Sequence, residues 1–146
     1  MTVTEEEQVL MHCLYFTASR FARNITKLAE KTLDGGDLAP SYLYMIMIVK
    51  FNPEITQKEL CSKLSIAPST STRFIDKLEK QMLVNRKVDG KETHISLTEE
   101  GEKVYDRFRT SLKEMFASYS EVLGKDFSLD LSKRLHDASN KLEELH

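Results

Sequence analysis

The sequence has few of the residues and patterns that mark membrane, secreted or metal-binding proteins. It contains two cysteines, Cys13 and Cys61, in neither a metal-ligand spacing nor a disulfide framework. Each lies among apolar positions of helical periodicity, so we expect both to be small buried side chains. The longest apolar run, residues 43–49, is too short to span a bilayer. The acidic residues 5–7 differ from the basic start of a secretory leader, so we expect a cytoplasmic protein.

Motifs of catalysis are also missing. The sequence has no Gly-rich phosphate-binding loop, nucleophile elbow or metal-ligand cluster, and its carboxylates fall on helix faces that we expect to be solvated. Its four histidines lack the spacing of zinc ligands. We therefore expect neither an enzyme nor a bound metal or cofactor.

Charge is distributed unevenly along the chain. The formal net charge is −2 over 146 residues, yet residues 56–91 contain eight Lys/Arg against four Asp/Glu, which gives this segment +4 and leaves −6 for the remainder. A local basic region is what binding to a phosphate backbone requires, whereas the overall sign mainly affects solubility. The middle of the chain is therefore the candidate for contact with nucleic acid.

Apolar steps of three and four predict helices over most of the sequence. The predicted ranges are 5–33, 40–51, 56–64, 68–81, 98–123 and 128–145. The turn at 34–37 ends the first range, and Pro40 and Pro68 suit the first turns of later helices. Thr56 and Glu59 have the spacing of a capping box, in which the two side chains bind backbone amides reciprocally.

Between residues 83 and 97 the apolar period changes to two. Residues 83–88 and 93–97 are predicted to be strands, and Asp89-Gly90 between them is favoured in tight turns whose two central residues need positive φ. The predicted fold class is therefore mainly α with a small β-hairpin: four helices, the hairpin, then two helices.

Two short capped helices followed by a basic hairpin predict a winged helix-turn-helix. With Phe74, Ile75 and Leu78 turned inward, the opposite side of the second helix carries hydroxyl groups and Arg73. In such proteins this helix enters the major groove, where Ser and Thr hydrogen-bond to base edges and Arg binds guanine in a bidentate way. The hairpin then contacts the DNA backbone or minor groove. The predicted DNA-binding residues are Thr56, Gln57, Lys58, Ser69, Thr70, Thr72, Arg73, Lys77, Arg86, Lys87 and Lys91.

The segments 64–73, 75–80, 83–86 and 95–101 resemble the MarR (multiple-antibiotic-resistance regulator) family of bacterial transcription regulators. The resemblance includes the helix order and extends over nearly the whole chain. It implies a homodimer on a pseudo-palindromic double-stranded DNA operator, usually a repressor. It also implies a small-molecule effector in the cleft between the DNA-binding and dimerisation parts.

The resemblance further implies that the terminal helices form the dimer. Residues 1–146 would then be one unit, with DNA binding in about 38–97 and dimerisation in about 5–34 and 98–146. The apolar residues from 131 to 145 alternate steps of four and three, which is the pattern of a narrow packing seam. The predicted dimerisation residues are Leu10, Leu14, Leu131, Leu135, Leu142 and Leu145.

Two positions depart from the family's pattern. Met82 stands where the family usually has Gly after the second helix, so the helix end is either capped differently here or strained. The hairpin is short and contains Lys91 where the family commonly has Arg. A lysine is less selective for a narrow minor groove.

Two other functions remain open. A winged-helix module for protein–protein contact would show no salt-dependent DNA affinity, and the basic hairpin argues against it. Some MarR relatives sense peroxides through a cysteine near the start of the first helix. Aligning residues 18–20 with such sensors places His12, not Cys13, at the reactive position, which disfavours thiol-based redox sensing.

Overall fold

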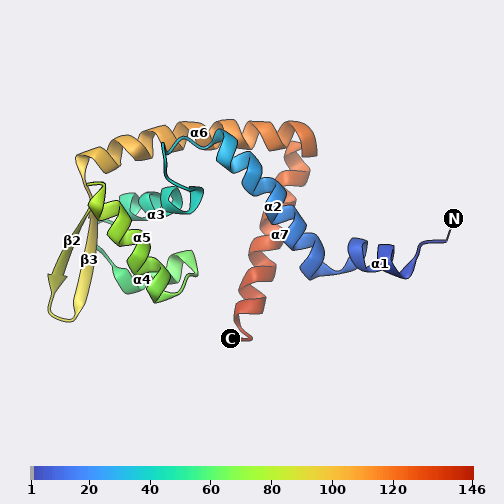
Figure 1. Ribbon diagram of the computed structural model, residues 1–146, viewed down its shortest axis with the longest axis horizontal. Coiled ribbons are helices and arrows are strands. Elements are labelled where there is room, and N and C mark those ends of the chain that lie inside the picture. The colour runs from blue at the N-terminus through green and yellow to red at the C-terminus, as the bar shows by residue number, and fades with distance from the viewer. Residues whose placement is uncertain (1) are drawn as a thin grey trace.

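A computed structural model describes residues 2–146 (Figure 1). Residues 40–97 form a winged-helix body, and a long helix over residues 99–123 joins it to a helical arm formed by residues 5–32 and 125–143. α6 runs along one edge of the molecule from the hairpin to the start of α7, and α2 and α7 cross below it in this view (Figure 1). The elements in chain order are α1 (Glu5–His12), α2 (Leu14–Thr32), α3 (Pro40–Phe51), β1 (Ile55–Thr56), α4 (Gln57–Leu64), α5 (Pro68–Lys80), β2 (Val84–Asp89), β3 (Glu92–Leu97), α6 (Glu99–Leu123) and α7 (Lys125–Glu143).

The core of the winged-helix body forms around α3. This helix is apolar on nearly every side, and Met45 and Ile46 have no exposed surface. Phe108 of α6 packs against the same core and is also completely buried. Because large apolar side chains meet here from α3, α5, α6 and the sheet, the burial of apolar surface fixes how these elements sit relative to one another.

The sheet has three antiparallel strands in the order β1-β3-β2. The short strand β1 was not predicted; it pairs Ile55 with Ile95 and joins the start of α4 to the hairpin. In the hairpin, Asp89 pairs with Glu92, so the loop is Gly90-Lys91 and the predicted Asp89-Gly90 turn is wrong by one residue. Gly90 has a φ of 62° and Lys91 does not have positive φ, which is the requirement of a type II′ turn.

The predicted single helix over residues 5–33 is wrong, because the chain leaves helical geometry at Cys13 (φ −76°, ψ 114°). α1 has its own capping box at Thr4 and Glu7 and buries none of its residues. No packing therefore holds it in line with α2. The last helix begins at Lys125, three residues before the predicted start, because Gly124 (φ 93°) makes the whole turn from α6.

Cys13 and Cys61 are both half-buried, so the expectation of full burial is wrong for each. No helix between residues 2 and 146 combines the length and the apolar character needed to cross a bilayer.

α5 ends in a Schellman motif built on a methionine. The amide of Leu83 donates to the Leu78 carbonyl, and the amide of Met82 donates to the Glu79 carbonyl. This pattern places Met82 at the position that usually takes glycine, with a φ of 63°. Of the two possibilities left open by the sequence, backbone strain at Met82 is therefore the one observed.

Met82→Gly should stabilise the protein by about 1 kcal/mol, because a Cβ disfavours left-handed backbone geometry. The Met82 side chain is 72% exposed, so its removal loses little apolar burial. Thermal unfolding should show a Tm higher by roughly 2–5 °C. Met82→Ala is the matched control, since it shortens the side chain but keeps the Cβ. Equal Tm values for the two variants would contradict strain at this position.

Candidate DNA-binding surface

The turn between α4 and α5 sets the angle at which α5 leaves the body. Ser65 ends α4 in left-handed geometry (φ 54°), and Pro68 opens α5. Thr56 caps α4 by accepting from the Glu59 amide, as predicted. The second half of the predicted capping box is not formed, because the Glu59 carboxylate accepts from the Thr56 hydroxyl and not from its backbone amide.

One side of α5 is fixed against the core. Ile75, Leu78 and Ser71 have no exposed surface. Phe74 is half-buried and stacks on Tyr42 of α3, with 4.3 Å between the ring centroids. These contacts confirm the predicted inward face of the helix and leave its opposite side towards solvent.

The exposed side of α5 carries a row of polar residues at steps of four, three and four. These are Ser69, Arg73, Asp76 and Lys80, and such spacing places them in line along one helix face. Among the described residues, the side chains of Ser69, Arg73 and Lys80 make no hydrogen bond or ion pair. Three of the four are therefore free to bind another molecule.

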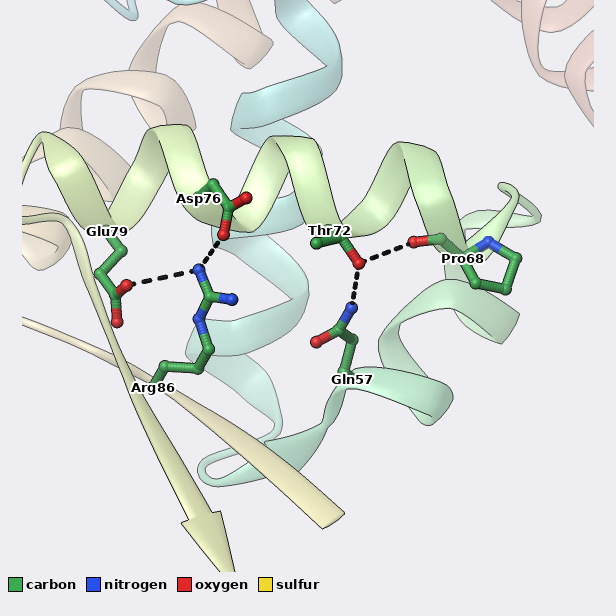
Figure 2. A network of polar contacts seen from close by, with 6 residues as sticks. All are labelled: Gln57, Pro68, Thr72, Asp76, Glu79 and Arg86. Atoms are coloured by element: carbon green, nitrogen blue, oxygen red, sulfur yellow. Dashed lines mark hydrogen bonds and ion pairs between the residues drawn. The ribbon is translucent and has the colours of Figure 1, made fainter. Parts of the chain in front are cut away.

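Thr72 lies on the flank of this row and is already hydrogen-bonded. Its hydroxyl donates to the Pro68 carbonyl at 3.0 Å and accepts from Nε2 of Gln57 at 2.8 Å (Figure 2). The predicted contact residues Gln57 and Thr72 therefore lie side by side and join the start of α4 to the first turns of α5. The second amide hydrogen and the carbonyl oxygen of Gln57 remain available.

Arg86 of β2 is engaged on the same flank of α5, nearer the end of the helix. Its Nη2 forms an ion pair with Asp76 and lies 3.3 Å from Oε1 of Glu79 (Figure 2). The predicted contact residue Arg86 thus points at the helix and not outward. No sequence pattern indicated this pairing, since the three residues belong to two separate elements.

The remaining lysines of the predicted site differ in whether they already contact another residue. Lys58, Lys87 and Lys91 are exposed and make no ion pair within residues 2–146. Lys77 instead lies over the ring of Tyr42, with 4.9 Å from Nζ to the centroid. A cation–π contact of this kind favours the ammonium group at that place. Thr70 and Thr56 are half-buried near the helix starts.

His94 links the wing to the turn before α4. Its Nδ1 donates to the Glu54 carbonyl at 2.8 Å, and its Nε2 lies 3.4 Å from Glu92. The hydrogen bond to Glu54 holds the pKa of His94 above its ordinary value of 6.5, and the charges of Glu92, Asp89 and Glu54 act in the same direction. Partial desolvation opposes this increase by a smaller amount.

The pKa of His94 predicts a pH dependence of stability. Because the folded state favours the charged imidazole, this contribution is fully present below pH 6.5 and is lost as pH rises through the raised pKa. Urea unfolding of wild type and His94→Gln across this range should show the decline in the free energy of unfolding for wild type alone. Glu92→Gln should lower the pKa of His94 in an NMR titration. Identical pH profiles for wild type and His94→Gln would contradict the role of this imidazole.

The predicted dimerisation residues lie in α1, α2 and α7 and in the residues that follow α7. Leu10, Leu14, Leu135, Leu142 and Leu145 are exposed, and Leu131 is half-buried. Leu14, Leu131 and Leu135 line an apolar groove of about 500 Å³ between α2 and α7. Exposed apolar side chains gathered in one place are typical of a protein–protein contact.

The α4–turn–α5 unit followed by the β2–β3 hairpin defines a winged helix-turn-helix protein. The model of the MarR family matches residues 40–90 of the chain. The HTH-type transcriptional regulator YwoH of Bacillus subtilis is 30% identical over 113 residues, which cover 73% of this chain and 82% of that protein. The chain belongs to the MarR family of transcriptional regulators, and the resemblance found in the sequence is confirmed.

Solved structures confirm the predicted fold class. The PcaV transcriptional regulator from Streptomyces coelicolor, in complex with its natural ligand, is similar with a TM-score of 0.78 and 20% identity, covering 95% of this chain and 99% of that one. The transcriptional repressor CouR, bound to a 23-mer DNA duplex, is similar with a TM-score of 0.81 and 17% identity, covering 94% and 99%.

Proposed function

We propose that the protein binds double-stranded DNA as a homodimer and represses transcription until a small-molecule effector releases it. The exposed row of α5 carries this proposal, since hydroxyl and guanidinium groups on a rigidly packed helix suit base edges in the major groove. Residues 38–97 form the DNA-binding part, and residues 5–34 and 98–146 the dimerisation part. The repressor CouR bound to DNA supports the assignment by likeness of fold. The protein is proposed to act in the cytoplasm and to have no catalytic activity.

The predicted contact residues divide by position. Ser69, Thr70, Thr72 and Arg73 lie in the first turns of α5, where a recognition helix meets base edges. Lys58 and Gln57 at the start of α4, and Lys77 near the end of α5, face backbone phosphates in this arrangement. Lys87 and Lys91 contact the DNA backbone or minor groove from the hairpin. Arg86 supports these two residues at the base of the hairpin.

Arg73→Ala should weaken binding to the DNA upstream of the protein's own gene by about 1–3 kcal/mol and relax the base preference at one position. The guanidinium group of Arg73 can bind O6 and N7 of guanine in a bidentate way. Fluorescence anisotropy at fixed salt measures the change. Arg109→Ala, on the exposed surface of α6, is the control and should bind as wild type does. Unchanged affinity after Arg73→Ala would contradict the assignment of α5 as the recognition helix.

The homodimer is supported by the apolar surface of the arm. Cys13 alone connects α1 to α2, and reversing the chain between two helices takes a loop of about two to five residues. α1 therefore cannot fold back over the groove beside its own α2. The exposed side chains of Val9, Met11 and Leu14 and the groove at Leu135 are left for a second copy of the chain.

Leu135→Glu should convert the dimer into monomers, because it places a charge in the apolar groove. Gel filtration with light scattering measures the mass. Leu129→Glu is the matched control: Leu129 is also exposed on α7, at 51% against 42% for Leu135, but it does not line the groove. A wild-type protein that is monomeric, or a Leu135→Glu variant that stays dimeric, would contradict this interface.

The arm is connected to the DNA-binding part in a way that allows effector control. α6 joins the two parts covalently, and the hydroxyl of Ser65, in the turn between α4 and α5, donates to Oε1 of Glu143 near the end of α7. An effector that moves the arm would thereby shift α5 relative to α5 of the second protomer. A coupling free energy of about 1–3 kcal/mol would change DNA affinity roughly 5- to 150-fold. The natural ligand bound by PcaV supports this part of the proposal.

A further inference from the structure

The exposed row of α5 contains one charge that opposes DNA binding. Asp76 lies between Arg73 and Lys80, and its side chain is 58% exposed. Glu79, one turn further on the flank, is 45% exposed. A carboxylate brought against backbone phosphates is repelled unless a cation cancels its charge, and such like-charge contacts cost several kcal/mol.

Arg86 is placed to offset one of these two negative charges. It pairs with Ile95 in the hairpin, so its backbone is fixed, and its guanidinium contacts both Asp76 and Glu79 (Figure 2). Its side chain is only 22% exposed. Within the described residues its Nε is buried and has no partner. The guanidinium group is therefore held in the junction between β2 and α5, turned away from solvent.

The neighbouring residue shows the contrast. Successive side chains of a strand point to opposite sides, and Lys87 is exposed with no ion pair among the described residues. A phosphate approaching the hairpin would reach the ammonium group of Lys87 directly. It would reach Arg86 only after displacing two carboxylates.

Building on the proposed DNA-binding function, we infer that Arg86 is a positioning residue, the internal counter-ion of the recognition helix, and that it makes no phosphate contact of its own. Its single positive charge offsets one of the two negative charges of Asp76 and Glu79, which reduces the repulsion as Arg73 and Lys80 approach DNA. What DNA binding requires at position 86 is a positive charge beside the two carboxylates, not a contact with a phosphate.

The test compares affinities for a fluorescein-labelled duplex of random sequence over a series of salt concentrations. Arg86→Gln leaves both carboxylates uncompensated and should weaken binding at low salt about tenfold. The triple variant Arg86→Gln, Asp76→Asn and Glu79→Gln removes the cation together with both anions. Because it removes one positive and two negative charges, it should bind at least as tightly as wild type and keep the wild-type slope of log K against log salt.

Lys87→Gln is the matched control on the same strand. Loss of a true phosphate contact should reduce the magnitude of the salt slope by about 0.9. A triple variant that stays as weak as Arg86→Gln, with its slope reduced as in Lys87→Gln, would show that Arg86 binds a phosphate and would overturn the inference. Wild-type affinity in Arg86→Gln itself would also overturn it.

Folding is followed by circular dichroism in every variant. If Arg86→Gln does not fold, the triple variant decides alone. Affinity at or above that of wild type supports the counter-ion role. A decrease of about 0.9 in the magnitude of the salt slope contradicts it. Absence of any salt-dependent binding by the wild-type protein is a different result. It would contradict the proposed function, and the inference would fail with it.

Discussion

The arrangement of the DNA-binding surface depends on the packing of one side of α5. Ile75 and Leu78 are completely buried, and Phe74 stacks on Tyr42 of the central helix α3. Turning α5 about its axis would expose these apolar groups and bury charged ones, which costs several kcal/mol. The hydrophobic core therefore decides which polar side chains face outward, although none of its members is proposed to touch DNA.

Polar contacts then refine what the packing has set. Gln57 and Thr72 join α5 to the start of α4, and Arg86 joins it to β2, so the recognition helix is held at two points along one flank (Figure 2). A helix held in this way loses little conformational freedom on binding, which lowers the entropic cost of recognition. Met82, the left-handed residue after α5, shows that the turn into the hairpin is kept even at a cost in backbone strain.

Much of the fold could be predicted from the sequence because its helices have strong apolar periodicity and clear caps. The exceptions have physical reasons. β1 is two residues long, too short for alternation, and is defined by its pairing with Ile95. The break at Cys13 has neither Gly nor Pro to mark it. The candidate site could be predicted as a set of exposed residues, and that set remains a prediction. The engagement of Arg86 with Asp76 could not, since it depends on how β2 packs against α5.

The central claim is that the exposed row of α5 meets base edges in the major groove, twice per dimer. Dimethyl sulfate protection measures this directly, because the reagent methylates guanine N7 in the major groove. We expect the protein to protect guanines in two clusters about 10 base pairs apart, or at a multiple of that spacing, on its upstream DNA. Protection confined to adenine N3 in the minor groove, or no protection in a complex that is demonstrably formed, would contradict the account.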